Sequence, residues 1–555
     1  MICSFLLLTV FCNHIGASPA KSGLPIVDLG YELHQANSYN VSGSFYNFSN
    51  IRYAAPPLGP LRFAAPQPPP IDRSQIQTGS TGRICPQAGP SWEAIQGSFV
   101  SAYLTGRPFN ASAVSSSNTG GSSMPSLDPR TTEDCLFLDI LVPKKILDGV
   151  RRQHYGRPTL APVMVWIYGG GYTAGEKSTY DGAPFLRTSD NGVIYVAINY
   201  RLGAFGWSSG PTFQSEGGTA NAGLRDQRFA LEWVQRYIHL FGGDRDRVMI
   251  FGESAGGGSV MHQVTAYGGE RGPVPFQAAL PQSPGFLPVV SAAKQERTYK
   301  GYLELLKVNT IEEARQLPSS ALITANLIQV ASSPYGQFTY GPVVDGVFVP
   351  ALPGQLLSYG AFDSRVRIMT GHNADEGLDF TPYYIQNDTA ARDNLEISLP
   401  DISKESLDFV LDTLYPPVYD GSLGYHDQIA RVALQTSELS FTCNDNYLAR
   451  AFKNRTYAYK FSMPPALHGQ DVPYTFDNGG GTSSGVQSVT VAHIMQEFIT
   501  SFAITGHPSS PTWGQQFPEY GSEANIVNLN VTSITVEKDD TANPRCYWWQ
   551  KGLFY

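Results

Sequence analysis

Charged side chains are scarce in this chain of 555 residues, of which only 15% are Asp, Glu, Lys or Arg. An average soluble protein carries roughly 25%. The net charge of −9 is spread along the sequence, and no cluster of Lys and Arg occurs that would follow a phosphate backbone. The composition therefore gives no support to a nucleic-acid partner, and we expect none.

Long hydrophobic runs are missing as well. No stretch reaches the length of about 18 apolar residues that a membrane-spanning helix needs, so we expect no transmembrane segment. A shorter apolar run from Ile2 to Cys12, followed by small residues through Ala20, resembles a secretory signal peptide, although the usual preceding basic residue is absent. We therefore expect residues 1–20 to be a signal peptide and residues 21–555 to form a single domain of a secreted protein.

Six Asn-X-Ser/Thr triplets agree with export, because such triplets are acceptors for N-glycosylation in secreted proteins. They begin at Asn40, Asn47, Asn110, Asn387, Asn454 and Asn530.

Cysteine is also rare, and two of the six cysteines lie in the expected signal peptide. The remaining Cys85, Cys135, Cys443 and Cys546 allow three pairings, and an oxidising compartment favours two disulfides over free thiols. Their spacing contains no Cys-x-x-Cys or Cys/His ligand pattern, so no metal site is expected.

What the sequence does contain is a set of nearly continuous apolar runs, at residues 162–168, 193–199, 248–252, 366–370 and 456–462. Such runs are typical of strands that are buried on both faces. Helical patterns lie between them, as at residues 224–241. Strands that alternate with helices predict an α/β fold with a mainly parallel sheet covered on both sides. Gly, Ser and Pro predict loops at residues 106–130 and 476–487.

The third run leads directly into Gly-Glu-Ser-Ala-Gly at residues 252–256. A serine between two glycines at the end of a strand fits a tight strand-to-helix turn, which exposes the hydroxyl above the sheet. The start of the following helix carries a partial positive charge that favours a developing anion. Ser254 is therefore predicted to be a nucleophile, whereas a flexible glycine-rich turn is the simpler alternative.

Three consecutive glycines, Gly169 to Gly171, follow the first run. Backbone N–H groups at such positions can point into a cavity with no side chain in the way. Acyl transfer requires two or three of these donors around the oxyanion of its tetrahedral intermediate. A turn selected for close packing is the alternative interpretation.

These motifs resemble those of the type-B carboxylesterases, a family that includes cholinesterases and some secreted fungal lipases. The matching segments are residues 133–138, 199–203, 223–228, 241–244 and 252–256. They occur in the family's order, and the resemblance extends from about Gly43 to the C-terminus. It implies the α/β-hydrolase fold, with a large, mostly parallel central sheet, helices on both faces, long loop insertions and no cofactor.

The resemblance also implies a catalytic acid within residues 373–377, where the family has a glutamate directly before a glycine. That residue is Glu376. Asp375 and Asp379 are competing carboxylates that the sequence alone does not separate from it.

The general base must follow the acid, because this fold orders its triad Ser, acid, His. Four histidines qualify: His426, His468, His493 and His507. His468 follows a predicted strand and matches the family's position for the base. His493 lies in a helical pattern, where a packing role is expected, and His507 lies in a Gly-His-Pro loop. His372, beside the acid, is expected to be a bystander.

By matching to the family, the N–H groups of Gly170, Gly171 and Ala255 would hold the oxyanion. Ser283 and Glu253 are expected to support the triad from behind it. The family also implies the disulfides Cys85–Cys135 and Cys443–Cys546.

Substrate choice is less constrained. Cholinesterases place a tryptophan about ten residues before the second cysteine of the first disulfide loop, where it stacks on the choline cation. This chain has Met124 to Leu127 there, which argues against choline esters, and Trp92 lies near the other end of the loop. The loop is interpreted equally as a lid over the site or as a solvated surface segment.

Three functions agree with these residues. The first is hydrolysis of small carboxylic esters that carry a hydrophobic group, through an acyl-enzyme. The second is an acyltransferase or transesterase of natural-product metabolism, which would use the same acyl-enzyme with a different acceptor. The third is a non-catalytic binding protein, which the presence of Ser254, Glu376 and His468 argues against. The sequence carries no signal for an oligomeric state.

Overall fold

The structure is a computed structural model of the chain and describes residues 23–118, 127–151, 159–452 and 455–555. The expected signal peptide and Asn454 lie outside the described residues.

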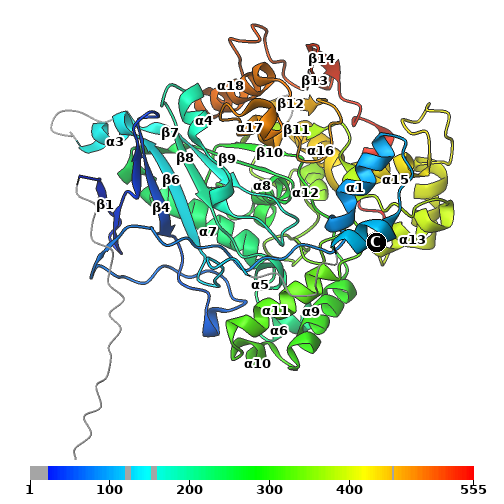
Figure 1. Cartoon of the computed structure of the whole chain (residues 1–555), viewed down its shortest axis with the longest axis horizontal. Coiled ribbons are helices and arrows are strands. Elements are labelled where there is room, and N and C mark those ends of the chain that lie inside the picture. The colour runs from blue at the N-terminus through cyan, green and yellow to red at the C-terminus, as the bar shows by residue number, and fades with distance from the viewer. Residues whose placement is uncertain (1–22, 119–126, 152–158, 453–454) are drawn as a thin grey trace, which may run out of the picture.

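An eleven-stranded sheet forms the centre of the described part of the chain (Figure 1). The strands from β13 to β8 in the order below run parallel, and antiparallel strands complete the sheet at both ends. In spatial order the strands are β14 (Ile534–Lys538), β13 (Asn525–Leu529), β12 (Thr456–Phe461), β11 (Arg367–Asn373), β10 (Ala278–Gln282), β9 (Gly243–Glu253), β7 (Ala161–Ile167), β8 (Ile194–Ile198), β6 (Phe137–Pro143), β4 (Phe45–Arg52) and β3 (Ser38–Asn40). A separate small sheet contains β1 (Ile26–Asp28), β2 (Leu33–Gln35) and β5 (Ile76–Gln77).

The central strands are apolar along their whole length because both faces of the sheet are covered. Every residue of β7, β8 and β10 is buried. The predicted strands agree with the structure to within a few residues, except that β9 begins at Gly243 rather than Val248. Its first residues are polar and partly exposed, which hides them from a search for apolar runs.

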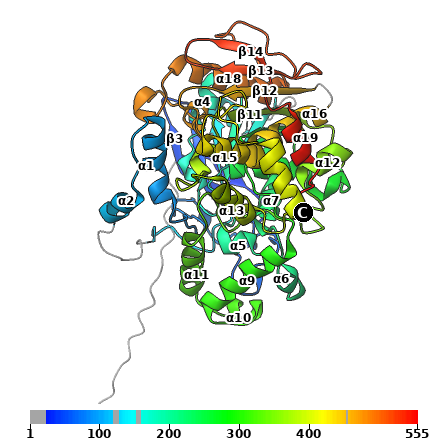
Figure 2. The ribbon, with the colours of Figure 1, turned by 90° about the vertical axis from the view of Figure 1, so that its right-hand side faces the viewer.

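Helices cover both faces of this sheet (Figures 1 and 2). On one face α18 packs against β7, β9 and α4, and on the other α8 packs against β9, β10 and α7. The α-helices are α1 (Glu93–Leu104), α2 (Ala111–Asn118), α3 (Lys144–Arg151), α4 (Ala183–Thr188), α5 (Gly203–Trp207), α6 (Pro211–Ser215), α7 (Ala222–Tyr237), α8 (Ala255–Val264), α9 (Ala292–Leu306), α10 (Ile311–Arg315), α11 (Ser319–Ala331), α12 (Pro353–Tyr359), α13 (Asp388–Ser398), α14 (Lys404–Phe409), α15 (Gln428–Ser437), α16 (Cys443–Ala451), α17 (Val472–Thr475), α18 (Val489–Thr505) and α19 (Pro544–Gln550).

The predicted loops hold more regular structure than expected. Within residues 106–130 the chain forms α2, so the expectation of a loop was wrong for Ala111–Asn118. Ala and Ser are compatible with a helix there, although the Ser-rich composition is more typical of loops. The other predicted loop contains a short 3-10 helix, η8 (Gly481–Ser484).

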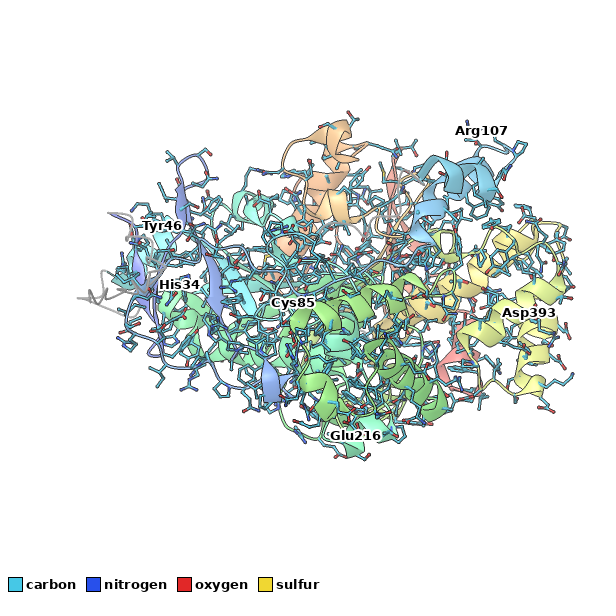
Figure 3. The ribbon with its side chains drawn as sticks, turned by 60° about the horizontal axis from the view of Figure 1, so that its bottom comes forward. His34, Tyr46, Cys85, Arg107, Glu216 and Asp393 are labelled. Atoms are coloured by element: carbon cyan, nitrogen blue, oxygen red, sulfur yellow. A yellow bond between two sulfur atoms is a disulfide. The ribbon has the colours of Figure 1, made fainter. Side chains whose placement is uncertain are left out.

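Helices α6, α9, α10 and α11 pack together as a lobe beside the sheet (Figure 2). Glu216, labelled within this lobe in Figure 3, connects helices α9 and α10. Its carboxylate accepts hydrogen bonds from the Tyr299 hydroxyl at 2.7 Å and from the Ile311 N–H at 2.9 Å. These contacts therefore tie the residue after α6 to the middle of α9 and to the start of α10.

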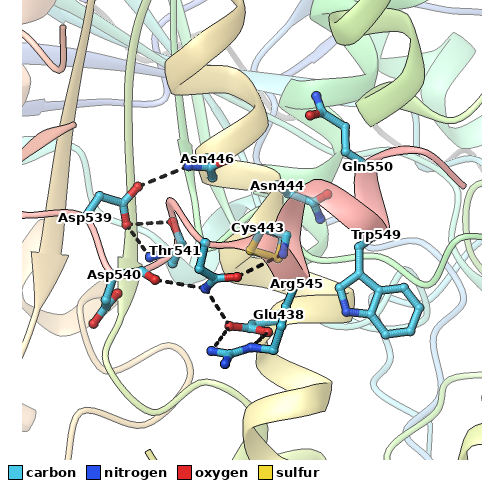
Figure 4. Close-up of a disulfide and its surroundings, with 12 residues drawn as sticks. Glu438, Cys443, Asn444, Asn446, Asp539, Asp540, Thr541, Arg545, Trp549 and Gln550 are labelled. Carbon is cyan, nitrogen blue, oxygen red and sulfur yellow. Dashed lines mark hydrogen bonds and ion pairs between the residues drawn. A yellow bond between two sulfur atoms is a disulfide. The ribbon is translucent and has the colours of Figure 1, made fainter. Parts of the chain in front are cut away.

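Two disulfides fasten the insertions. Cys85, labelled in Figure 3, is bonded to Cys135 with a Cα–Cα distance of 5.0 Å. Cys443 is bonded to Cys546 with a Cα–Cα distance of 5.1 Å, so the start of α16 is tied to the C-terminal helix α19 (Figure 4). Both pairings are those that the family resemblance implies.

Across the described ranges, no helix is both long enough and apolar enough to cross a membrane.

Candidate active site

Ser254 lies on a sharp turn between β9 and α8. Its backbone has φ 58° and ψ −124°, a conformation that L-residues rarely adopt. The neighbouring strand explains the flanking glycine, since a Cβ added at Gly256 would lie 2.0 Å from the Ile167 carbonyl oxygen. Only glycine at the flanking positions lets the turn pass this close to β7, and the strained turn exposes the Ser254 hydroxyl at the carboxyl end of the sheet.

Three of the predicted side chains form one hydrogen-bonded chain. Ser254 Oγ lies 2.8 Å from His468 Nε2, and His468 Nδ1 lies 2.5 Å from Glu376 Oε2. They follow β9, β12 and β11, whose carboxyl ends share one edge of the parallel sheet. With its proton on Nδ1, neutral His468 donates to Glu376 and accepts from the serine hydroxyl.

Glu376 is fully buried and is surrounded by hydrogen-bond donors. Its Oε1 accepts hydrogen bonds from Ser283 Oγ at 2.7 Å and from the Asn373 N–H at 2.6 Å. Burial alone would raise the pKa of this carboxyl group, but the charge of His468 and these hydrogen bonds outweigh burial and lower it. Glu376 is therefore ionised, and Ser283 occupies the supporting position that the family resemblance gave it.

His468 packs against two aromatic rings, at 5.0 Å from Phe380 and 4.5 Å from Phe441, measured between ring centroids. Burial lowers the pKa of its imidazole, but the charges of Glu376 and Glu253 outweigh this and raise it to about 9. The site therefore favours the charged imidazolium, which is the form that appears when His468 takes a proton.

Neither competing carboxylate takes the position of Glu376, although Asp379 also lines the outer side of the site. Asp379 accepts a hydrogen bond from Gln96 on α1, and burial raises its pKa to about 6. The Asp375 backbone pairs with the segment before His468 through its N–H, which donates to the Ala466 carbonyl at 2.9 Å. Among the three carboxylates, only Glu376 makes a hydrogen bond to His468 Nδ1 in the described part of the chain.

The other histidines are remote from this chain of hydrogen bonds. His372 pairs with Asp445 at 3.1 Å, His507 contacts the Tyr457 hydroxyl at 2.6 Å, and His426 is exposed. The expected packing role of His493 is wrong, because its side chain is 50% exposed on α18. Helical periodicity identified the helix correctly but placed this residue on the wrong face.

The glycines predicted to surround the oxyanion border the same serine. Gly170 and Gly171 have φ values of 106° and 61°, which favour glycine. A Cβ added at Gly171 would lie 2.2 Å from the Phe338 ring, so a side chain there would displace the wall of the site. Ala255 is the first residue of α8, where a backbone N–H has no partner within its own helix.

Glu253 lies on the other side of His468 from Glu376. Its Oε1 is 3.5 Å from His468 Nε2 and, among the described residues, has no hydrogen-bond partner. Burial raises the pKa of this carboxyl group to about 8, with the charges of Asp471 and Glu376 adding to burial and that of His468 opposing it. Glu253 is therefore largely protonated at neutral pH.

Two cavities meet at Ser254. We call the more enclosed one the inner cavity; it spans about 1160 Å³ including its open mouth. The more exposed one, the outer cavity, spans about 820 Å³ on the same basis and includes His468 and Glu253 in its wall. Ser254 and Gly171 border both cavities, whereas His468 borders only the outer one.

A π-helix, η7 (Glu438–Thr442), supplies part of the inner wall and was not predicted. It brings Phe441 against His468, and its first residue is held firmly (Figure 4). Glu438 accepts hydrogen bonds from Nε and a terminal nitrogen of Arg545, both at 2.7 Å. No periodicity in the sequence signals a π-helix, although such segments are frequent at functional sites.

Trp92 also lies at the site, although nothing in the sequence placed it there. Its ring stacks on Tyr335 with 5.1 Å between centroids, and it lines the outer cavity. The tryptophan donates through Nε1 to the Gln337 carbonyl at 2.8 Å. It therefore fastens the first disulfide loop to the segment that walls both cavities.

No group of three or more His, Cys, Asp or Glu side chains is arranged to hold a metal ion within the part of the chain that the structure describes.

A parallel sheet with a serine on a strand-to-helix turn, an imidazole and a buried carboxylate defines a serine hydrolase of the α/β-hydrolase fold. The model of the carboxylesterase family matches residues 32–549, and the chain belongs to this family. It is a carboxylic ester hydrolase that acts through an acyl-enzyme.

Individual relatives agree with this assignment. The chain is 42% identical over 544 residues to carboxylesterase patB of Penicillium expansum, covering 96% of each chain. It is 31% identical over 540 residues to lipase 2 of Geotrichum candidum, covering 90% of this chain and 91% of the lipase. The crystal structure of EstA of Aspergillus niger has the same fold, with a TM-score of 0.77 and 24% sequence identity. The match covers 95% of this chain and 98% of EstA.

Proposed function

We propose that Ser254, His468 and Glu376 are the catalytic triad of this esterase. The observation that supports the proposal is the continuous hydrogen-bonded chain from Ser254 Oγ through His468 to Glu376. In the first step, His468 Nε2 takes the hydroxyl proton while Ser254 Oγ bonds to the carbonyl carbon of the ester. Glu376 holds the imidazole in place and stabilises the imidazolium that forms.

The carbonyl electrons move to oxygen during this attack. The N–H groups of Gly170, Gly171 and Ala255 would donate to that oxyanion, and each such donor is worth about 3–4 kcal/mol. When the carbonyl re-forms, the bond to the alcohol oxygen breaks and His468 gives its proton to the departing alcohol. A water molecule then attacks the acyl-enzyme in the same way, with His468 as base, and releases the acid and Ser254.

The two cavities divide the substrate between them. The departing alcohol must lie beside His468, because the imidazole gives it a proton, and His468 borders only the outer cavity. The acyl group is therefore assigned to the inner cavity. The walls of that cavity include Phe286, Leu287 and Phe338, so they suit an acyl group with an apolar portion.

We also propose that the protein is secreted. The two disulfides are stable in an oxidising compartment, and a relative of the chain, 32% identical over 397 residues, is a secreted lipase of Arthroderma benhamiae. Asn40, Asn110 and Asn387 are exposed, as glycosylation requires, whereas Asn47 and Asn530 are half-buried. Intact mass and N-terminal sequencing of protein from the culture medium test removal of residues 1–20 and glycan attachment.

Substitution of the nucleophile tests the triad most directly. Ser254→Ala should lower kcat on a simple aryl ester by a factor on the order of 10⁶. Wild-type protein should be labelled by a fluorophosphonate at Ser254, and the variant should not.

Two histidine variants form a matched pair for the same test. His468→Ala should be nearly inactive, whereas His493→Ala should retain wild-type activity because its side chain is exposed on α18. Near-normal hydrolysis by the Ser254 or His468 variant would contradict the assignment.

A further inference from the structure

The wall of the inner cavity contains a lysine that no motif predicted. Lys294 lies on α9 and lines this cavity together with Phe286 and Leu287. Its Nζ donates to the Ser398 carbonyl at 3.3 Å, and the carboxylate that acts on it among the described residues, Asp401, does so through its charge and not through a hydrogen bond. An ammonium group inside a cavity with only one neutral partner has hydrogen-bonding capacity left for a ligand.

The position of Lys294 in its helix makes this cation unfavourable for the protein alone. It lies in the first turn of α9, and the Ser291 hydroxyl accepts a hydrogen bond from its backbone N–H. The partial positive charge at the start of a helix disfavours a cation there. Nearby Arg297 adds repulsion, which Asp401 partly offsets. A stability role therefore does not account for Lys294, whereas attraction of an anion does.

Other polar atoms in the same wall also lack partners. Gln435 is only 2% exposed, and its Oε1 has no hydrogen-bond partner in the described part of the chain. The hydroxyl of Tyr335 is buried and likewise unpartnered there. Both residues line the inner cavity. Buried polar atoms without partners are rare in folded proteins. A ligand that carries polar atoms would supply the hydrogen-bond partners that these atoms lack.

Lys294 lies away from the serine end of this cavity. It also borders a smaller neighbouring hollow, whose wall includes Leu399 and Phe554 but not Ser254. An acyl chain that extends from Ser254 toward this hollow shares the cavity with the Phe286 and Leu287 side chains and with the Lys294 ammonium group.

We propose that the inner cavity selects an acyl group with a carboxylate at its far end, and that Lys294 is the residue that recognises this carboxylate. The substrate class is then a half-ester of a dicarboxylic acid, and the Tyr335 hydroxyl, which can donate a hydrogen bond, is a further polar contact. This inference rests on the proposed triad and on the assignment of the acyl group to the inner cavity.

The test compares matched ethyl esters. Half-esters of dicarboxylic acids from succinate to suberate are paired with ethyl esters of monocarboxylic acids of equal carbon number, and released ethanol is measured. A charge-assisted contact of the usual strength predicts that, at the best length, wild-type kcat/KM favours the half-ester by about tenfold or more. A preference for the uncharged ester at every length would overturn the proposal.

Two variants separate charge from packing. Lys294→Met keeps the length of the side chain without its charge and should remove the half-ester preference, with little change on the uncharged ester. Lys294→Arg should retain much of the preference. An ethyl ω-hydroxy ester serves as the neutral polar control, and if it equals the half-ester in wild type and Lys294→Met alike, charge recognition is refuted.

A pH series on the wild-type protein tests the role of Lys294 without a substitution that could disturb folding. Burial, with the charge of Arg297 adding and that of Asp401 opposing, lowers the pKa of Lys294 to about 8. The half-ester preference should therefore be full below this pH and decline as pH rises through it, while effects of the triad cancel in the ratio of the two substrates. A ratio that does not change with pH would refute the role of Lys294.

Failure of the triad itself would look different. In that case neither ester of a pair would be hydrolysed and Ser254 would not react with fluorophosphonate, whereas failure of this inference leaves both reactions intact and changes only the selectivity.

Discussion

Two buried glutamates flank His468 and differ in ionisation. Glu376 receives hydrogen bonds from the Ser283 hydroxyl and the Asn373 N–H, and its pKa is lowered. Glu253 has an oxygen without a partner in the described structure, and burial raises its pKa to about 8. Both side chains are close to the same imidazole, so distance alone does not set their charge.

The comparison shows that hydrogen-bond donors decide which of the two buried carboxylates stays charged. A buried carboxylate without hydrogen-bond donors takes up a proton, whereas one with several donors stays charged. Glu376 therefore orients and charges the imidazole through Nδ1, while Glu253 can vary its protonation beside Nε2. The roles of the two glutamates can be tested by separate substitutions.

The largest effect is expected from Glu376→Gln. The amide cannot stabilise the imidazolium and presents a donor to Nδ1, so kcat should fall by roughly 10³–10⁴, as for the corresponding change in other serine hydrolases. Asp375→Asn and Asp379→Asn are the controls and should retain most activity. A larger loss in either control would give the role of the acid to that residue.

A smaller effect is expected from Ser283→Ala, which removes one donor from Glu376. The loss of one hydrogen bond to a charged group, of about 1.5–3 kcal/mol, should raise the pKa of Glu376 and lower kcat by about tenfold or somewhat more. Measurement of kcat above the pKa of His468 checks this, because activity rises with pH as His468 loses its proton and Glu376 stays ionised throughout that range. An unchanged kcat would show that the Asn373 N–H suffices.

The smallest effect is expected from Glu253→Gln, the isosteric counterpart of the first change. The negative charge of Glu253 raises the pKa of His468, so its removal should lower that pKa. The increase of kcat/KM with pH, which follows deprotonation of His468, should then occur at lower pH. Above that rise, kcat should change by less than about tenfold, because Glu253 makes no hydrogen bond to Nδ1. A fall in kcat as large as that of Glu376→Gln would show that the two glutamates contribute equally to the reaction.

The sequence predicted the fold, and it pointed to the residues proposed as the triad, because the signals for both are local. The elbow around Ser254 combines an apolar strand with glycines that the neighbouring β7 requires. The acid remained ambiguous among Asp375, Glu376 and Asp379, because the donors that separate them come from β11 and from Ser283 after β10, which only the folded sheet brings together.

Other features carry no local signal. Strand β10 contains Pro281, which is unusual within a central strand, and was not predicted. Lys294 lies in an ordinary amphipathic helix, so nothing in its surroundings in the sequence distinguishes it from a solvated surface lysine. The exposed face of α18 at His493 shows the same limit, because periodicity predicts a helix more reliably than it predicts which way one residue faces.

The π-helix η7 joins α15 to α16, so the three segments form a continuous coil between Gln428 and Ala451. Each residue of an α-helix turns the chain by about 100°. Deleting Thr442 would therefore rotate Phe441 and the residues before it relative to Cys443, which the disulfide holds, and Phe441 would no longer face the imidazole. The number of residues in this segment therefore decides which side chains line the inner cavity, and relatives that differ by a single insertion or deletion here should differ in the shape of that cavity.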